Sequence, residues 1–159
     1  MRFISQKLKT NIFIKYFGIT KVPLIFFCRP KVVDISKNSV TLKIPLIRRT
    51  KNHVGSMYIG ALCVGADLSS ALLSLRLVDK SKMKVVPIFK DMKADFIKRA
   101  EGDVHFICNE GEKINAMIAK AISQKNRINE SINVTAFVPE KLGDVPVAKF
   151  SLTLSLKAY

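Results

Sequence analysis

The sequence predicts an α+β fold in which an antiparallel sheet wraps around one long central α-helix, with a further helix at the N-terminus. Apolar and polar residues alternate with the period of a strand in several segments after residue 31. A stretch of 22 residues, Val54 to Leu75, contains no Lys, Arg or Glu and only one acid, Asp67. A sheet with one apolar face needs a cover, and a helix that is apolar on most sides needs burial, so each satisfies the other.

Residues 1–28 are predicted to form a helix followed by an apolar lead-in. Residues 1–16 are basic, and Phe3, Ile4, Lys7, Leu8 and Ile12 lie near helical spacing, so we expect this helix to pack on the domain. The segment has no long apolar core and no small-residue cleavage site, which argues against a secretory signal. A second interpretation is that this basic segment touches a membrane surface.

The remaining elements follow from periodicity and turn residues. In chain order we expect strands over 32–36 and 39–47, the long helix over 58–78, strands over 84–98 and 103–108, a short helix over 111–123, and strands over 130–138 and 145–157. The last strand is the clearest, because Phe150, Leu152 and Leu154 alternate with polar residues. The turn before it is expected at residues 142–144.

The central helix is long enough to cross a membrane, and a membrane-spanning helix is the alternative interpretation. Asp67 would then lie near the middle of the bilayer, at a cost of roughly 2.5–3.5 kcal/mol on insertion scales. Serines within the stretch lower its hydrophobicity further, and the segments after it alternate like strands of a water-soluble sheet. We therefore expect a helix buried on most sides by its own protein.

Length and composition fit one globular domain over residues 1–159, with residues 29–159 as its core. The three cysteines, Cys28, Cys63 and Cys108, are far apart and lie in apolar surroundings. They predict buried free thiols in a reducing compartment, which we take to be the cytoplasm. Cys108 and His105 have no second pair of ligands at zinc spacing, so we expect no metal site.

The segment that leads into the central helix carries a motif. Asn52, Gly55 and Gly60 begin it, and Asp67 follows within the helix. This spacing resembles that of hot-dog fold thioesterases of the phenylacetyl-CoA type, which carry Asn-x-x-Gly-x-x-His-Gly-Gly before a helix with a catalytic acid. The likeness extends over roughly residues 30–157 and is nearest to an uncharacterised branch of that superfamily, a domain of unknown function.

The resemblance implies roles for individual residues. Backbone N–H groups of Ile59 and Gly60 would form an oxyanion hole at the helix N-terminus. Asp67 would be general base or nucleophile, and Asn52 would position the water or the carboxylate. Gly55, Tyr58 and Ser70 would position substrate. Two departures from the pattern are Tyr58 in place of His and Ile59 in place of the first Gly, and the Ile59 side chain could narrow the thioester slot.

Helix geometry then requires two subunits. Ile59 and Asp67 are eight residues apart, or about 12 Å at 1.5 Å per residue. Catalytic groups must lie within roughly 3 Å of the reacting atoms, so one helix cannot supply both. Two antiparallel helices across a twofold axis can, and we therefore expect a homodimer, with a dimer of dimers left open.

The net charge of +15 is concentrated at the N-terminus, where residues 1–51 carry 12 basic residues and one acid. Such a chain attracts nucleic acid, anionic lipid or the phosphates of coenzyme A. The sequence has no Trp and no glycine–aromatic RNA-binding motif, so the interpretation that the chain binds nucleic acid rests on charge alone. If coenzyme A is the carrier, the candidates for its phosphates are Arg48, Arg49, Lys98 and Arg99.

The predicted function is hydrolysis of acyl-CoA or a related acyl thioester, with no cofactor beyond the coenzyme A of the substrate. The alternative is a non-catalytic acyl-CoA-binding sensor on the same fold, which the departures at Tyr58 and Ile59 would suit. Asp67 also has a purely structural interpretation, in which its carboxylate accepts a hydrogen bond from a backbone or hydroxyl group, with Ser70 and Ser74 nearby at helical spacing.

Overall fold

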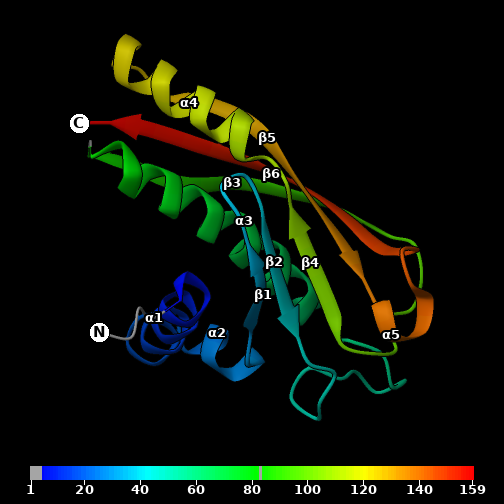
Figure 1. Cartoon of the computed structure of the whole chain (residues 1–159). Coiled ribbons are helices and arrows are strands. Elements are labelled where there is room, and N and C mark those ends of the chain that lie inside the picture. The colour runs from blue at the N-terminus through cyan, green and yellow to red at the C-terminus, as the bar shows by residue number, and fades with distance from the viewer. Residues whose placement is uncertain (1–4, 83) are drawn as a thin grey trace.

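The computed structural model describes residues 5–82 and 84–159, and in it an antiparallel sheet wraps around a long central helix (Figure 1). This is the expected α+β architecture. The helices are α1 (Gln6–Thr20), α2 (Pro23–Cys28), α3 (Ile59–Ser81), α4 (Gly111–Gln124) and α5 (Pro139–Leu142). The strands are β1 (Lys31–Ile35), β2 (Val40–Ile44), β3 (Val85–Phe96), β4 (Val104–Cys108), β5 (Ile128–Phe137) and β6 (Pro146–Ala158).

The sheet has the strand order β1-β2-β4-β5-β6-β3, and every neighbouring pair is antiparallel. The two edges differ. The edge at β1 is contacted by Asn11 of α1, whose Oδ1 accepts from the Val32 N–H at 2.9 Å. On its other side β3 pairs with no strand among the described residues, so β3 leaves a long row of backbone groups free.

The alternation predicted for the last strand is confirmed in β6. Phe150, Leu152, Leu154 and Leu156 are buried against the helices, whereas Lys149 is exposed. Ser155 is the exception, since it is buried on the opposite face, where it accepts a hydrogen bond from Arg127 Nη1 at 3.0 Å. Burial on one face is what fixes the register of this strand.

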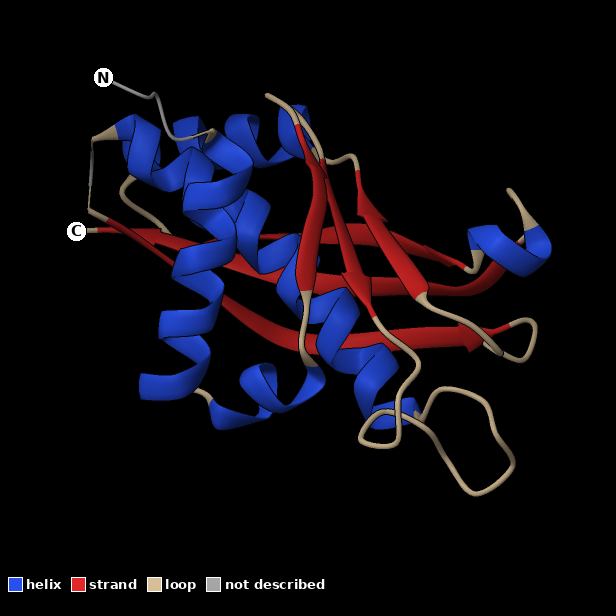
Figure 2. Ribbon diagram, turned by 60° about the horizontal axis from the view of Figure 1, so that its bottom comes forward, coloured by secondary structure: helices blue, strands red, loops and turns tan. Residues whose placement is uncertain are grey.

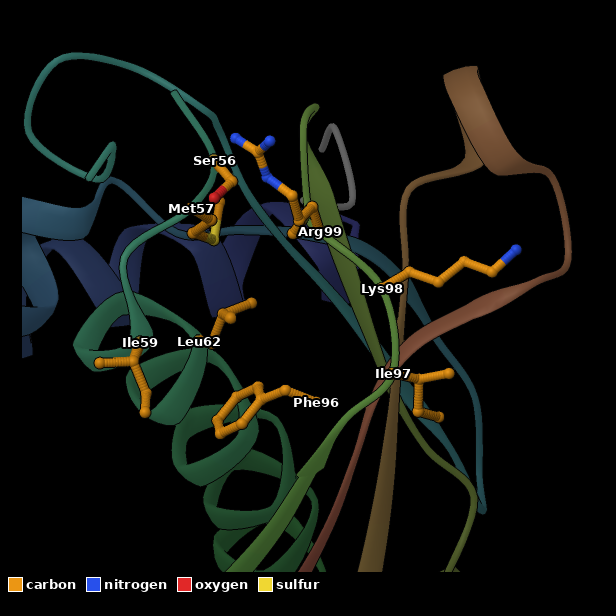
Figure 3. Close-up of a pocket in the computed structure, with 9 residues that line it drawn as sticks. Ser56, Met57, Ile59, Leu62, Phe96, Ile97, Lys98 and Arg99 are labelled. Carbon is orange, nitrogen blue, oxygen red and sulfur yellow. The ribbon is translucent and has the colours of Figure 1, made fainter. Parts of the chain in front are cut away.

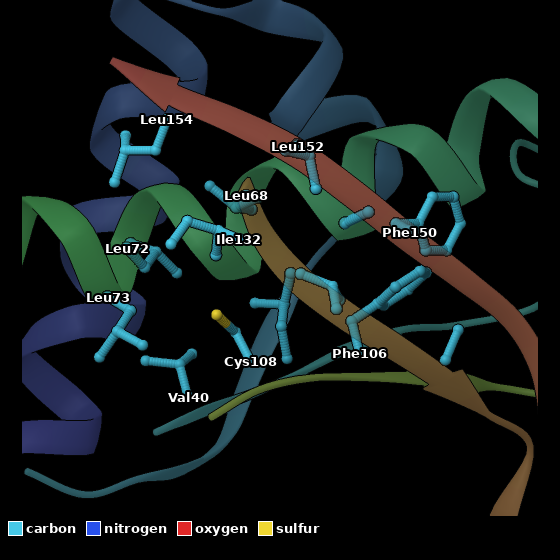
Figure 4. Close-up of a cluster of buried hydrophobic side chains, with 14 of the residues drawn as sticks. Val40, Leu68, Leu72, Leu73, Phe106, Cys108, Ile132, Phe150, Leu152 and Leu154 are labelled. Carbon is cyan, nitrogen blue, oxygen red and sulfur yellow. The ribbon is translucent and has the colours of Figure 1, made fainter. Parts of the chain in front are cut away.

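Helix α3 fills the concave side of the sheet and forms the core with it (Figure 4). It is long and apolar enough to cross a membrane, but 67% of its most apolar window is buried inside the protein. Gly65 allows the close approach to the sheet, because a Cβ there would lie 2.2 Å from the Phe106 ring. The helix is thus covered by its own protein, as expected.

Helices α1, α2 and α4 lie on the same side of the sheet as α3, whereas α5 lies at the end of the sheet in the connection between β5 and β6 (Figure 2). Helix α4 is the predicted short helix, and its buried stripe contains Ile114, Met117, Ile118 and Ala121. Helices α1 and α2 contact each other and approach α3 on the side away from the strands. Helix α3 is therefore enclosed by the sheet, α4 and the N-terminal pair.

The first helix is present and packs on the domain as expected, but not through the residues whose helical spacing predicted it. Leu8 and Ile12 are 51% and 54% exposed, and Phe3 and Ile4 lie outside the described residues. The helix packs through Ile14 and Gly18 instead. Both faces of α1 are apolar, so periodicity alone could not distinguish the buried face from the exposed one.

Two short helices were not predicted. Helix α2 occupies the apolar lead-in, and α5 precedes the turn expected at residues 142–144, which is present at residues 143–144. Each begins with a proline, Pro23 or Pro139, at its first position, where the missing N–H costs nothing. Elements of one turn or little more carry no periodic signal, so the pattern of apolar residues could not reveal them.

Candidate active site

The loop that leads into α3 is held by the side chain of Asn52. Its Oδ1 accepts from the backbone N–H groups of Val54 and Ser56, both at 3.1 Å, and its Nδ2 donates to Ser56 Oγ at 3.0 Å. Gly55 sits at the tip of this loop with φ +86°, a conformation that L side chains rarely adopt. In the single chain, Asn52 and Gly55 shape the loop that places the start of α3.

Tyr58 and Gly60 are in contact at the N-terminus of α3. The Tyr58 N–H donates to the Thr50 carbonyl at 2.8 Å, which fixes its backbone. A Cβ on Gly60 would lie 2.6 Å from Cε1 of the Tyr58 ring, so the ring lies over the glycine. The tyrosine is 55% exposed, and its ring therefore lies beside the first turn of the helix where a ligand could meet it.

The first turn of α3 presents free backbone donors. The first N–H paired within the helix belongs to Leu62, which donates to the Tyr58 carbonyl at 3.1 Å. No side chain caps this end and no acid lies in the first turn. In the described part of the chain, the N–H groups of Ile59 and Gly60 have no hydrogen-bond partner. Such a turn favours an anion or a developing oxyanion.

A pocket of about 330 Å³ opens at this helix end (Figure 3). Ile59 and Leu62 form one wall, and residues 96–100, which comprise the last residue of β3 and the four that follow it, form the other. Phe96 faces Ile59 across the pocket. Sequence reasoning did not identify Phe96 or Ile97 as lining residues, because nothing in the linear pattern links the end of β3 to a helix that starts 37 positions earlier.

Two of the four basic residues proposed for phosphates lie at this pocket. Arg99 stands beside Ser56 and Met57, donates to the Val54 carbonyl and pairs with Glu101 at 3.3 Å. Lys98 lines the same pocket and extends outward (Figure 3). Arg49 is not brought to the pocket, since its guanidinium lies 5.1 Å from the centre of the Phe27 ring of α2. Arg48 is exposed and does not line the pocket either.

Asp67 lies two turns further along α3 and is half-buried. Among the described residues its carboxylate has no hydrogen-bond or ion-pair partner, and burial raises the pKa of that carboxyl above its ordinary 3.8. The side chain lines two cavities: one of about 290 Å³ beneath α1 and α2, and one of about 350 Å³ beside β3 that also includes Lys90 and Asp91. An unpaired carboxylate of raised pKa in a cleft is the typical state of a general base.

The serines of α3 are bound to its own backbone. Ser70 is fully buried, and its hydroxyl donates to the carbonyls of Ala66 at 2.9 Å and Asp67 at 3.0 Å. Ser74 donates in the same way to the Ser70 carbonyl at 2.8 Å. In one chain Ser70 is therefore not brought together with the helix N-terminus, and neither hydroxyl reaches the Asp67 carboxylate.

A single chain does not unite the two halves of the site. Ile59 lines the pocket at the start of α3, whereas Asp67 lines only the cavities further along the helix. The helical rise separates them by about 12 Å. The donors and the carboxylate each face a cleft, but the clefts are different ones.

The three cysteines are free thiols that differ in burial. Cys28 and Cys108 are buried free thiols as expected, and burial raises the pKa of Cys108 to about 11. Cys63 is free but only half-buried, beside Asp67 in the cavity next to β3. Within the described ranges, no three His, Cys, Asp or Glu side chains are close enough together to bind a metal ion.

Comparison with known proteins identifies the family of this chain. The family described as a domain of unknown function, DUF4442, matches residues 10–155. No curated protein matches the chain.

Several solved structures share the fold. One from Pseudomonas aeruginosa, a protein of unknown function described as a probable thioesterase, is 23% identical with a TM-score of 0.78, and the match covers 93% of this chain and 95% of that one. A protein of unknown function from Chlorobaculum tepidum is 13% identical with a TM-score of 0.81 over 96% and 97% of the chains. Zebrafish thioesterase superfamily member 2 is 11% identical with a TM-score of 0.64 over 98% and 99%. At these identities the likeness establishes the hot-dog fold alone.

Proposed function

This chain belongs to the DUF4442 family on a hot-dog fold of the thioesterase superfamily, and we propose that it hydrolyses acyl-CoA or a related acyl thioester at a site shared by two subunits. The observation that carries the proposal is the pair of unsatisfied groups on α3. The free N–H groups of Ile59 and Gly60 suit an oxyanion, and the unpaired carboxylate of Asp67 suits a base.

The chemistry uses each group once. The thioester oxygen accepts hydrogen bonds from the Ile59 and Gly60 N–H groups, which stabilise the negative charge that develops there. Asp67 takes a proton from water as the water oxygen attacks the carbonyl carbon. The tetrahedral intermediate then collapses, the C–S bond breaks, and the proton held by Asp67 passes to the thiolate. The products are a carboxylic acid and a thiol.

We propose a homodimer because these groups lie apart in one chain and because, among the described residues, the edge of β3 is free. Its exposed apolar side chains include Ile88 and Met92, which are 48% and 37% exposed and lie on opposite faces because a bulge interrupts the alternation between Phe89 and Met92, and Phe96 lies at its end. A long edge strand with exposed apolar residues is a template for pairing with another chain. Pairing of β3 with the partner's β3 across a twofold axis sets the two α3 helices antiparallel. Asp67 of one subunit can then approach the Ile59 end of the other.

Lys98 and Arg99 are the residues we propose for the phosphates of coenzyme A, because both line the pocket at the oxyanion donors. Arg48 and Arg49 lie away from that pocket and are less suited to this role. The free thiols fit a reducing compartment, for which we propose the cytoplasm.

A specific observation favours a second function, an acyl-CoA-binding sensor. The Ile59 side chain is 52% exposed and lines the pocket where the thioesterase pattern has glycine. A branched side chain there could admit the pantetheine arm yet hold the thioester away from the backbone donors. The sensor predicts binding of acyl-CoA without hydrolysis.

The test is hydrolysis of a panel of acyl-CoA thioesters, from acetyl to palmitoyl with phenylacetyl and benzoyl, by the wild type and Asp67→Asn. We expect turnover in the wild type and its loss in Asp67→Asn, which keeps the size of the side chain but cannot accept the proton. Binding without turnover in the wild type would support the acyl-CoA-binding sensor in place of the hydrolase. Neither binding nor turnover with any thioester would overturn both.

A further inference from the structure

A cavity lies between the N-terminal helix pair and α3, on the side of α3 that faces away from the sheet. It has a volume of about 290 Å³. Phe13 and Phe17 of α1, Leu24 and Ile25 of α2, and Ala71 of α3 are among the residues that line it. Every lining residue is apolar except Asp67. We call this cavity the α1–α2 chamber.

Asp67 stands where the chamber meets the cavity beside β3. Both cavities include Val64 and Asp67 in their walls, so these two residues form the partition between them. The cavity beside β3 lies on the side where the proposed partner subunit would bring its oxyanion donors. A group held near the Asp67 carboxylate could therefore extend from the β3 side into an apolar space.

We propose that the α1–α2 chamber binds the acyl chain of the thioester, with the carbonyl carbon near Asp67 and the methyl end beneath α1 and α2. This inference rests on the proposed function. An enclosed apolar cavity of about 150 Å³ is known to hold one benzene ring, so 290 Å³ has room for an aliphatic chain of roughly ten to twelve carbons. The preferred substrates are then medium-chain thioesters.

The chamber gives a quantitative signature of chain length. Each methylene that enters an apolar site tightens binding about fourfold. Affinity should therefore rise with chain length until the chamber is full and then stop rising. Fluorescence or calorimetric titration of Asp67→Asn with octanoyl-, decanoyl-, dodecanoyl- and palmitoyl-CoA measures this, because the variant cannot consume the ligand.

Ala71→Phe tests whether the chamber sets the limit. A phenyl ring placed from α3 takes about half of the cavity, so the limit should shift to chains shorter by roughly six carbons. The matched control is Ala119→Phe on the exposed face of α4, which should leave the limit unchanged. Ala71→Leu is a smaller step in the same direction, and it keeps the test available if the phenylalanine variant fails to fold.

The outcomes separate this inference from the proposed function. A shortened limit in Ala71→Phe supports the chamber even if the wild type hydrolyses nothing, since the readout is binding. Turnover in the wild type together with an identical chain-length profile in Ala71→Phe would keep the hydrolase and overturn the chamber.

A second inference rests on the outer surface of the same helices. Leu8, Ile12, Tyr16 and Ile19 form a stripe along α1 and are 51% to 64% exposed. Phe26 of α2 lies beside this stripe, since it lines one cavity with Leu8, and Leu24 and Phe27 of α2 are exposed as well. Exposed apolar residues that gather on one surface mark an interaction site.

The charges that α1, α2 and their flanking residues carry are all of one sign. Residues 5–33 contain no acid, and the exposed basic residues of this segment are Lys7, Lys9, Lys15, Lys21, Arg29 and Lys31. A second copy of a chain with net charge +15 would place like charges against like. An anionic lipid surface instead accepts both the apolar stripe and the lysines. We infer that α1 and α2 dock on an anionic membrane surface.

Sedimentation with vesicles tests this docking. We expect the full chain to bind phosphatidylserine–phosphatidylcholine vesicles, to bind pure phosphatidylcholine vesicles much less, and to be released as salt rises. The double variant Ile12→Ser with Ile19→Ser should lose binding, whereas Val145→Ser, an exposed valine before β6, should not. Equal sedimentation of the double variant and the wild type would overturn the inference. So would a double variant that forms smaller oligomers, since the stripe would then join copies of the chain.

Discussion

Replacement of Ile59 by proline removes one proposed oxyanion donor with little cost to the fold. Ile59 is the first residue of α3, the position at which proline is most readily accepted. The residue before it, Tyr58, has φ −65° and ψ 140°, the extended conformation that a following proline requires. The Ile59 side chain is 52% exposed, so its replacement removes little packing. In the described part of the chain its N–H donates no hydrogen bond.

The expected effect follows from the loss of a single hydrogen bond to the transition state. Removal of one donor from an oxyanion hole typically lowers kcat by about 100- to 1000-fold, or about 2.7–4 kcal/mol. The assay is steady-state hydrolysis of the best acyl-CoA of the panel, with thermal unfolding as a check on the fold. Ile59→Ala is the matched control, because it removes the side chain and keeps the N–H. If Ile59→Pro folds and keeps a kcat close to that of Ile59→Ala, the oxyanion role of this N–H is refuted.

The same variant reveals whether the site is shared between subunits. Ile59→Pro and Asp67→Asn chains are each expected to be inactive alone. In a mixed dimer of twofold symmetry, one of the two sites has both an intact Asp67 and an intact Ile59. Random mixing of equal amounts should then restore about a quarter of the wild-type activity. Activity that stays at the level of the separate variants after verified subunit exchange would place both groups in one subunit or outside the site.

Three further predictions concern pH, phosphate binding and packing. Burial raises the pKa of Asp67 above 3.8, so kcat/KM should rise with pH through this raised pKa as the carboxyl group loses its proton. A pH–rate profile whose acidic limb is centred at or below 3.8 would contradict a buried base. Lys98→Ala should raise KM for coenzyme A thioesters and leave KM for pantetheine thioesters, which lack the nucleotide phosphates, unchanged; equal effects on both would exclude the phosphate role. Gly65→Ala should lower the free energy of unfolding by about 1–3 kcal/mol in a urea titration, since its Cβ would lie 2.2 Å from the Phe106 ring, and an unchanged midpoint would show that the ring has room to move.

Much of the fold could be predicted from the sequence because the strongest patterns belong to its largest elements. The alternation of apolar and polar residues in β6 and the scarcity of charged residues in α3 both result from burial. The pattern of apolar residues therefore predicts these two elements. The orientation of α1 could not be predicted, because Leu8 and Ile12 are as apolar as Ile14 and only the tertiary contacts decide which are buried. The helix α2 is too short to carry a periodic signal.

The candidate site could be predicted in part for a similar reason. Ile59, Gly60 and Asp67 are on one helix, so a motif in the linear sequence contains them all. The pocket walls are not local: Phe96 reaches Ile59 only because β3 returns past the start of α3. Among the four basic residues, linear position favoured none, and the fold brings only Lys98 and Arg99 to the pocket.

The environment of Asp67 helps to decide between its two interpretations. A carboxylate kept for structural reasons in an apolar helix should accept hydrogen bonds, because burial without them costs several kcal/mol. Ser70 and Ser74 are spaced to provide them, yet both hydroxyls donate to backbone carbonyls of α3. In the described part of the chain the carboxylate is left without a donor, beside two cavities, and with a raised pKa. A group that destabilises the fold and makes no compensating contact is better explained by a ligand or a proton that it must meet than by packing.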